Sequence, residues 1–386
     1  MRRPLSLPGL LLLLLALIGC APQVPPPPAI RSPGIGAQAP VPPPPPPAAM
    51  ARSRVGLLLP LSGANAALGH AMLNAAQLAL FDQQDPRVEF LPRDTRSSGA
   101  GAAEAAREAL AEGASVLVGP LTLAETQAAA QLARGAGVPM LAFTTDETLA
   151  GNGVWTLGLG PLQAGRRLAE LARNAGARRI ALLVPEGEFG RRLAAGLRAG
   201  LAAPGQPAPL LVRSIRNDPA EALREIAQLA AGPEGPDTLI IGAEGALARQ
   251  IAQGLPAAGF TRPIRLIGNH LWAGDATLLA EPALAGALFP GPDPEARAPF
   301  DARYREAFGE EPARLAGTAY DAAALAARAA RAGGRALPVG EAFQGADGPI
   351  RLDAQGLLAR GLAIFRIEGG RAVLVEPAPL PGLAGS

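Results

Sequence analysis

The single cysteine of the chain, Cys20, ends a segment that carries the chemistry for lipidation. Arg2 and Arg3 form a positively charged start, and residues 10–18 form an apolar core too short for an ordinary transmembrane helix. The core ends in Leu-Ile-Gly-Cys, which resembles a bacterial lipobox, where the cysteine thiol is the nucleophile that takes the lipid. We expect residues 1–20 to be a lipoprotein signal peptide and Cys20 to carry the anchor. An ordinary signal peptide with an incidental cysteine is the alternative.

The residue after this cysteine bears on the membrane that is reached. Ala21 stands there instead of Asp, and by the usual bacterial sorting convention this favours the outer membrane, with the protein facing the periplasm. The predicted localisation is therefore the cell envelope, by a lipid anchor.

No other residues form a recognised catalytic pattern. The chain has no G-x-S-x-G elbow, no H-E-x-x-H and no phosphate loop ending in Lys-Ser/Thr, and Gly158-Leu159-Gly160 lacks the third glycine of a dinucleotide fingerprint. His70 and His270 are far apart, and a total of one Cys and two His excludes a disulfide framework and argues against a zinc cluster. We predict no enzyme activity, no metal and no cofactor.

The charge balance gives no footprint for nucleic acid. All 35 basic residues are Arg, against 33 acidic residues, and removal of the segment that contains Arg2 and Arg3 leaves a charge near zero. The length of 386 residues exceeds what one core usually supports, which indicates two lobes or one domain with appendages.

Residues 21–53 have a composition that cannot form a core. Two proline blocks, at 25–28 and 42–47, are joined by Gly, Ala and Ser with almost no charge. An extended polyproline tether rises ~3.1 Å per residue and could reach on the order of 100 Å. We expect a disordered tether. A semi-rigid spacer, a passive linker and a docking site for a proline-reading module are the three interpretations.

After residue 53, short apolar runs alternate with amphipathic stretches. The runs are apolar on both faces and closed by Pro or Gly, which is typical of buried parallel strands. They lie at 55–59, 88–91, 116–118, 138–143, 180–184, 239–241 and 264–267. Leu73, Ala76 and Leu80 recur at helix spacing between the first two runs. The alternation predicts right-handed βαβ units and a doubly wound α/β fold.

The phrases that join these elements resemble one family. Val55 to Leu80 reads as a strand, Pro-Leu-Ser-Gly and a helix led by Gly, and Phe343 to Gly356 (FQGADGPIRLDAQG) is the most specific phrase. Over residues 54–380 the order and spacing resemble the type I periplasmic-binding-protein fold of the leucine/isoleucine/valine-binding family. The resemblance implies two doubly wound parallel-sheet lobes joined by three crossovers. It assigns 54–160 and 276–340 to lobe 1, and 161–275 and 341–381 to lobe 2.

The resemblance also implies a ligand cleft lined by the loops at the carboxyl ends of the strands. The candidate cleft residues are Ser62, Gly63, Asp94, Leu121, Thr122, Thr144, Thr145, Asp146, Phe189, Glu244, Asn269, His270 and Trp272. For each residue an ordinary loop role is the alternative, because Ser-Gly makes turns and Asp or Thr caps helices.

The amino-acid site of the family is largely dismantled in this sequence. Family members hold a zwitterionic ligand with hydroxyls, an aromatic and an acid, but Leu68 stands where the first loop usually has its aromatic. The loop after the third strand keeps one hydroxyl, at Thr122, and the lobe 2 aromatic is Phe189, without a hydroxyl. Asp146 introduces a carboxylate where a ligand carboxylate would sit. A site that hydrogen-bonds a zwitterion loses much of its affinity for that ligand when the hydrogen-bonding residues are replaced by apolar ones.

The chain combines a lipobox, a proline-rich tether, this fold and a degraded amino-acid site. In this combination it resembles the penicillin-binding protein activators, lipoproteins with an LpoA-type C-terminal domain. The resemblance implies a non-catalytic, membrane-tethered regulator that activates a class A penicillin-binding protein, a peptidoglycan synthase. Better-known activators carry an N-terminal helical-repeat domain where this chain has its proline-rich segment. The alternative is a solute-binding lipoprotein of an ABC transporter for amino acids or related molecules. A small-molecule or muropeptide ligand is left open, and no nucleic-acid partner is expected.

Overall fold

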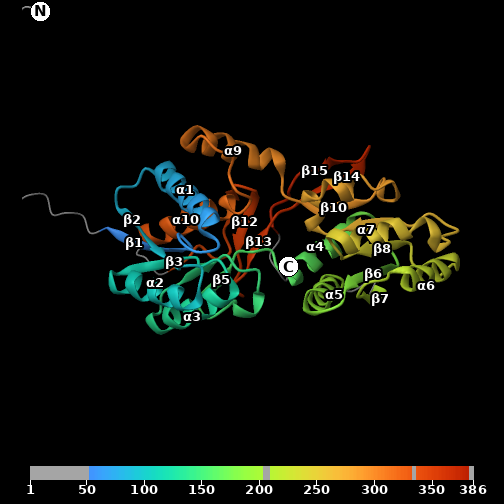
Figure 1. Cartoon of the computed structure of the whole chain (residues 1–386), viewed down its shortest axis with the longest axis horizontal. Helices are drawn as coiled ribbons and strands as arrows, with labels where there is room; N and C mark the ends of the chain where they lie inside the picture. The colour runs from blue at the N-terminus through green and yellow to red at the C-terminus, as the bar shows by residue number, and fades with distance from the viewer. Residues whose placement is uncertain (1–51, 203–208, 333–335, 382–386) are drawn as a thin grey trace, which may run out of the picture. The chain divides into compact units, whose positions relative to one another are not determined.

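The first sheet has five parallel strands in the order β2-β1-β3-β4-β5 (Figure 1). They are β1 (Ser53–Leu59), β2 (Val88–Asp94), β3 (Ala114–Val118), β4 (Met140–Ala142) and β5 (Val154–Thr156). The computed structural model describes residues 52–202, 209–332 and 336–381. The expected signal peptide, the lipidated Cys20 and all of the tether but its last two residues lie outside these ranges.

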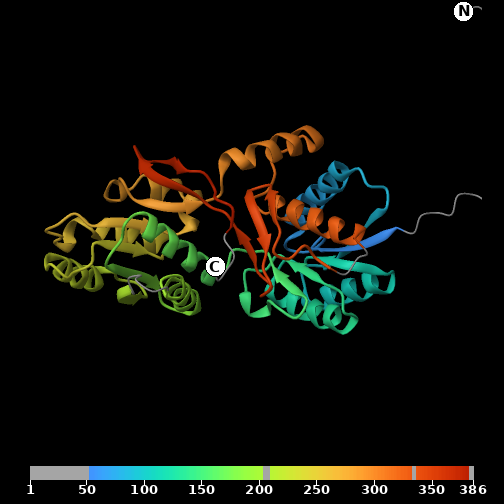
Figure 2. The same cartoon turned by 180° about the vertical axis from the view of Figure 1, so that it is seen from behind.

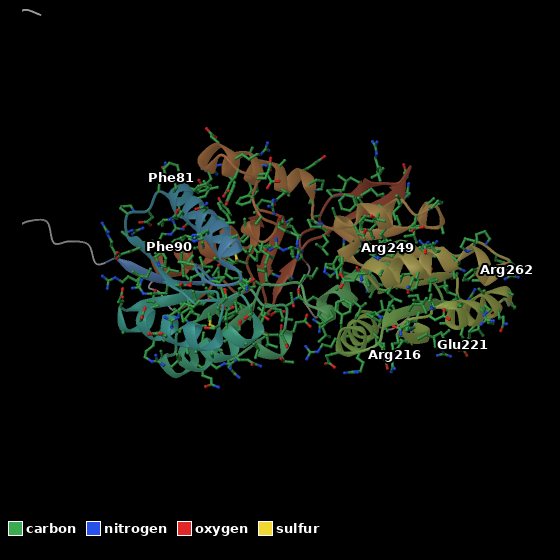
Figure 3. All side chains as sticks on the ribbon, viewed as in Figure 1. Phe81, Phe90, Arg216, Glu221, Arg249 and Arg262 are labelled. Carbon is green, nitrogen blue, oxygen red and sulfur yellow. The ribbon has the colours of Figure 1, made fainter. Side chains whose placement is uncertain are left out.

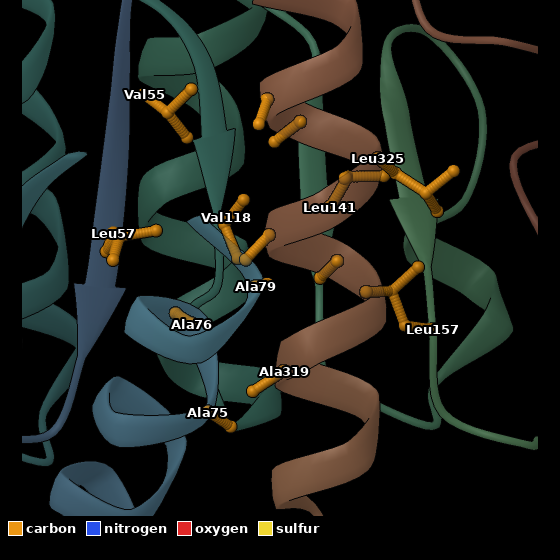
Figure 4. Close-up of a cluster of buried hydrophobic side chains, with 14 of the residues drawn as sticks. Val55, Leu57, Ala75, Ala76, Ala79, Val118, Leu141, Leu157, Ala319 and Leu325 are labelled. Carbon is orange, nitrogen blue, oxygen red and sulfur yellow. The ribbon is translucent and has the colours of Figure 1, made fainter. Parts of the chain in front are cut away.

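Helices cover both faces of this sheet, which is why its strands are apolar on both sides. Helices α1 and α10 pack on the face that carries Val55 and Leu57 (Figure 4), and α2 and α3 pack on the face that carries Leu58 and Leu117. The helices of this part are α1 (Ala66–Gln83), α2 (Gly99–Ala111), α3 (Leu123–Ala136), the 3-10 turn η1 (Glu147–Leu149), α9 (Pro294–Phe308) and α10 (Ala316–Arg331). Alanine dominates the inner surfaces of α1 and α10, so the two helices approach closely.

The second sheet has seven strands in the order β15-β14-β10-β9-β8-β6-β7. Its parallel part comprises β6 (Ile180–Pro185), β7 (Pro209–Ile215), β8 (Thr238–Ile241), β9 (Arg265–Gly268) and β10 (Leu288–Gly291). The hairpin of β14 (Ala363–Glu368) and β15 (Arg371–Glu376) adds two antiparallel strands beside β10 (Figure 2). Its two-residue turn is Gly369-Gly370, both at positive φ.

The second sheet is also covered on both faces. The helical elements are α4 (Pro161–Asn174), α5 (Glu188–Gly200), α6 (Ala220–Ala231), α7 (Gly245–Gly254), η2 (Pro256–Ala258), η3 (His270–Gly274), α8 (Ala276–Leu279) and η4 (Pro282–Leu284). Helices α4 and α5 touch backbone to backbone, because Gly165 and Gly196 face each other's helix. A Cβ added at Gly196 would lie 2.1 Å from the Leu162 carbonyl oxygen.

A third, antiparallel sheet completes the part built on the first sheet. It consists of β11 (Ala342–Gly345), β12 (Gly348–Leu352) and β13 (Leu358–Arg360). Ile350, Leu352 and Leu358 join the core formed by α1, α10 and the first sheet. We call the first and third sheets with their helices the first lobe, and the second sheet with α4 to α8 the second lobe.

Within the described residues the chain passes between the lobes three times, after β5, after β10 and after β13. The expected fold is confirmed, but two segments differ from the sequence-based assignment. Strand β10, in the segment 276–340 assigned to lobe 1, pairs with β9 and β14 of the second sheet. Strands β11 to β13, in the segment 341–381 assigned to lobe 2, pack on the first-lobe core because their apolar side chains face α10.

The antiparallel strands β11 to β15 were not predicted from the sequence, and three parallel strands, β5, β7 and β10, were missed as well. Strand β5 has only three residues, β7 contains Arg213 and Ser214, and β10 contains Pro290 and Gly291. None of them is a continuous apolar run, so the sequence signal for a buried strand is missing.

Candidate functional site

Asp94 organises the loop that follows β1. The Ser62 hydroxyl donates to Asp94 Oδ2 at 2.6 Å, and the backbone N–H groups of Leu61, Ser62 and Arg96 donate to Oδ1 at 2.9, 3.0 and 2.8 Å. Partial burial alone would raise the pKa of Asp94, but these hydrogen bonds outweigh it and hold the pKa below its usual value. Gly63 makes the turn at φ 81°. The structure thus brings these predicted residues together, and they satisfy one another.

Thr122 also forms hydrogen bonds within the chain, in its case as a helix cap. It is the N-cap of α3, and its hydroxyl and backbone N–H both donate to Glu125 Oε2, at 2.7 and 2.8 Å. The other oxygen of this buried carboxylate accepts a hydrogen bond from the Thr95 hydroxyl. Leu121 packs against the first-lobe core. This polar group therefore links the loops after β2 and β3 and offers Thr122 little freedom to bind a ligand.

The predicted residues after β4 are also engaged internally. Asp146 caps η1 and accepts hydrogen bonds from the backbone and the hydroxyl of Thr148 at 2.9 and 2.5 Å. The Thr144 hydroxyl accepts the N–H of Asp146 at 3.1 Å, whereas Thr145 is exposed. Partial burial would raise the pKa of Asp146, but the bonds from Thr148 and the charge of Arg192 lower it. The Asp146 carboxylate is thus ionised, and its hydrogen bonds are already made to Thr148.

Two acids of this loop bind to helices of the second lobe. Arg192 of α5 lies 3.5 Å from Asp146 Oδ1 and also donates to Glu188 Oε1 at 2.7 Å. The Glu147 carboxylate accepts the N–H groups of Leu162 and Gln163 at 3.2 and 3.1 Å, at the first turn of α4. Burial raises the pKa of Glu147 despite these bonds. The chain's own carboxylate therefore fills the anion-binding position at this helix N-terminus.

The second-lobe candidates Phe189 and Glu244 provide little recognition chemistry. Phe189 is half-buried and packs on the core beneath α4 and α5. Glu244 is exposed at the start of α7, where its side chain makes no capping hydrogen bond.

The residues after β9 are structural. Asn269 is fully buried and donates to the carbonyls of Gly242 and Ala243 at 2.8 and 3.2 Å. Trp272 is also fully buried and donates to the Ala243 carbonyl at 3.0 Å, so it packs in the second-lobe core instead of lining an opening. The Nδ1 atom of His270 is buried without a hydrogen-bond partner among the described residues. Burial, and then the charge of Arg314, lower the pKa of His270 to about 4, so the side chain is neutral.

A buried charge network in the first lobe was not predicted. Asp321 of α10 accepts the N–H of Ala346 at 2.6 Å and lies 3.2 Å from Arg360 Nη2. Arg360 also lies 3.5 Å from Asp347, which accepts a 2.6 Å hydrogen bond from Arg297 of α9. Burial raises the pKa of Asp321 to about 6, against the opposing charge of Arg360. The sequence signal for this network was an Asp inside the Ala-rich phrase AYDAAALAARAA.

The network includes residues of the phrase at 343–356. The two glycines Gly317 and Gly345 make room for it, because a Cβ at Gly345 would lie 2.8 Å from the Asp321 carboxylate, and one at Gly317 would lie 2.9 Å from Arg297. The phrase thus fastens the third sheet to α9 and α10.

Two open hollows on the described surface, of about 510 and 320 Å³, contain no predicted site residue. In the same ranges no group of three His, Cys, Asp or Glu side chains is arranged to hold a metal ion. No helix there has the length and apolarity needed to cross a membrane.

The fold and these strand-end loops define a binding-protein architecture. A profile of the periplasmic binding protein family matches residues 53–371. The chain therefore belongs to the periplasmic binding protein family. None of the curated proteins compared with it matches.

Solved structures similar to this chain include solute-binding proteins and an LpoA domain. A putative branched-chain amino acid ABC transporter protein of Rhodospirillum rubrum has 20% identity and a TM-score of 0.71, with 84% of this chain and all of that chain covered. The LpoA C-domain of Haemophilus influenzae, a regulator of PBP1A, has 20% identity and a TM-score of 0.65 at the same coverage. An R. palustris solute-binding protein in complex with benzoate has 22% identity and a TM-score of 0.56, with 87% and 99% covered. At these identities the likeness establishes the fold.

Proposed function

We propose that this protein is a non-catalytic, lipid-anchored regulator of cell-wall synthesis that activates a class A penicillin-binding protein by direct contact. In this proposal Cys20 carries the anchor at the outer membrane, and the proline-rich tether at 21–53 carries the two-lobed domain into the periplasm. The likeness to the LpoA C-domain over its whole length supports this role.

The observation that carries the proposal is the internal use of the polar groups at the strand ends. Recognition of an amino acid needs donors and acceptors that are free to meet its carboxylate and ammonium groups. Here Asp94 accepts from the Ser62 hydroxyl and three backbone N–H groups, and Thr122 is bound to Glu125. Each of these hydrogen bonds would have to break before its donor or acceptor could bind a ligand, at a cost on the order of 1 kcal/mol or more.

The loop after β4 adds to this argument. Asp146 faces Arg192 of the second lobe, and Glu147 takes the N-terminus of α4. Both contacts use groups with which binding proteins hold an anionic ligand, a guanidinium and a helix N-terminus. The carboxylates of Asp146 and Glu147 already occupy these positions. We therefore propose that the lobes bind a protein and not an anionic small molecule.

A solute-receptor role is the second candidate, and the R. rubrum and R. palustris structures favour it. A thermal-shift titration separates the two roles. The mature lipoprotein is titrated with the amino acids, with aromatic acids and with peptidoglycan fragments. A ligand at 100 times its Kd stabilises the folded state by about 2.7 kcal/mol. We expect no rise in Tm with amino or aromatic acids, and a rise would support the solute receptor.

A pull-down from solubilised envelopes completes the test. The wild-type lipoprotein is expected to retain a class A penicillin-binding protein, and retention of an ABC permease without a synthase would contradict the proposal. A Cys20→Ser variant serves as the control for anchoring, because it should lose the membrane without losing the synthase in a detergent extract.

A further inference from the structure

One arginine of the first lobe is buried without a counter-charge. Most arginines of the chain hold their charge at the surface, as Arg216 and Arg262 of the second lobe do (Figure 3). Arg351 of β12 is instead only 7% exposed, and its Nε atom is buried with no hydrogen-bond partner in the described part of the chain. Arg351 forms no ion pair there either. A guanidinium group is always charged, and the burial of an unpaired charge is costly.

Two other arginines of this lobe with nearly buried side chains are paired with acids of the chain. Arg360 lies 3.2 Å from Asp321, and Arg297 donates to Asp347 at 2.6 Å. The lobe thus provides a carboxylate for each of these two guanidinium groups. Arg351 departs from this pattern, so its charge is free to meet an anion from outside the chain.

The Arg351 side chain lies on the outer face of the third sheet. Its neighbours along β12, Ile350 and Leu352, face the first-lobe core, so Arg351 is directed to the opposite face. The residues paired with it across the sheet are Ala342 of β11 and Ala359 of β13. Two small apolar side chains therefore flank Arg351 on this face, and neither offers a negative charge.

The outer face of the third sheet is open on the side of β11. Strand β11 is an edge strand, and Ala342 and Gln344, which share the face of Arg351, are both exposed. Asp353 is the nearest acid along the chain, but its Oδ1 atom accepts two backbone N–H groups of the turn after β12, at 3.0 and 2.7 Å. An acid of another molecule can therefore approach Arg351 over β11 without displacing an internal ion pair.

We propose that Arg351 binds a carboxylate of a partner protein, an Asp or Glu side chain that enters over β11. The donors of a guanidinium group form a planar fork that matches the two oxygens of a carboxylate. Arginines in desolvated positions are typical of the residues that dominate protein interfaces. This inference rests on the proposed protein-binding role, and it adds that the partner surface is acidic and contacts the third sheet.

Thermal unfolding of the full lipoprotein tests whether the charge is unpaired within the chain. Arg351→Met removes the charge and keeps a long side chain, so its Tm should equal or exceed that of the wild type. Arg360→Met removes a paired guanidinium group and should lower the Tm by several degrees. A loss for Arg351→Met as large as that for Arg360→Met would overturn the proposal, because it would mean that Arg351 is bound within its own chain.

Photo-crosslinking of the full lipoprotein in its own membrane tests the partner. A photoreactive phenylalanine analogue replaces Gln344 or, as a control, Gln131, which is exposed on α3 of the same lobe. Irradiation should join the chain to a class A penicillin-binding protein from position 344 and not from position 131. Arg351→Gln should reduce this band at least about tenfold. Arg107→Gln, which removes the same charge from an exposed position on α2, should leave the band unchanged.

The outcomes separate this inference from the proposed function. A band with a different protein, lost in Arg351→Gln and crosslinked beside an acidic residue, would support the Arg351 site and contradict the synthase as the partner. The absence of any band from position 344 would overturn the site. So would bands of equal intensity from the wild type and Arg351→Gln at equal Tm.

Discussion

Replacement of Asp321 by Asn tests the buried charge network that fastens the third sheet to the first lobe. Asp321 is 3% exposed, and burial raises its pKa from 3.8 to about 6. Because the folded state holds the proton more tightly, the stabilisation from protonation is fully present below pH 3.8 and is lost as the pH rises through about 6. A shift of this size corresponds to about 3 kcal/mol at 1.36 kcal/mol per pKa unit.

Most of this effect falls in an accessible range of pH. Between pH 7 and pH 4.5, protonation of Asp321 should raise the free energy of unfolding of the wild type by about 2 kcal/mol. Asn carries no titrating proton, so the Asp321→Asn variant should lack this contribution. The quantity to measure is therefore the change with pH of the difference between the two proteins, which removes the contribution of all other groups.

Urea unfolding followed by tryptophan fluorescence gives this difference. Trp155 lies in the first lobe, where its indole donates to the Asp353 carbonyl at 2.9 Å, and Trp272 lies in the second. With Trp272→Phe in both proteins, the signal reports the first lobe alone. An Asp218→Asn variant, at an exposed carboxyl group, is the control. Equal pH slopes for wild type and Asp321→Asn would refute the reasoning, because they would mean that Arg360 keeps Asp321 ionised throughout.

Three further predictions concern the second lobe and its link to the first. Gly196→Ala should destabilise the protein by about 2–3 kcal/mol, because its Cβ would lie 2.1 Å from the Leu162 carbonyl oxygen, and a lower urea midpoint for the second-lobe signal checks this. His270→Gln should reduce the loss of stability on acidification. The pKa of this histidine is lowered to about 4, so the stability present above pH 6.5 is lost as the pH falls through about 4, and an unchanged acid limb of the Tm profile would count against burial as the cause. Arg192→Ala removes the partly exposed pairs with Asp146 and Glu188 and should lower stability by less than about 1 kcal/mol, and a larger loss in urea unfolding would show that these pairs do more than their geometry indicates.

The architecture could be predicted because most of the parallel strands coincide with apolar runs that are closed by glycine or proline. Runs such as 55–59 and 180–184 are buried on both faces, and this signal survives in the sequence. The short strand β5 and the proline-containing β10 lack it, and their place in the sheets depends on pairing with distant strands.

The positions of the candidate residues in strand-end loops could be predicted from the sequence, but their hydrogen-bond and ion-pair partners could not. The resemblance placed Ser62 and Asp94 in loops that follow strands, and in the structure the Ser62 hydroxyl donates to the Asp94 carboxylate. The sequence could not indicate that Asp146 would pair with Arg192, since the two residues are 46 positions apart on different lobes. Asp321 was missed for the same reason, because its partners lie in a different part of the chain.

The proposed activation of a peptidoglycan synthase by the two-lobed domain can be measured on the synthase itself. The purified lipoprotein is added to a purified class A penicillin-binding protein with lipid II, and cross-linked product is measured over time. We expect a saturable rise in cross-linking with lipoprotein concentration, and excess leucine or benzoate should leave this rise unchanged. No rise at any concentration, together with a Tm increase on addition of an amino or aromatic acid, would contradict the account and identify the protein as a solute receptor.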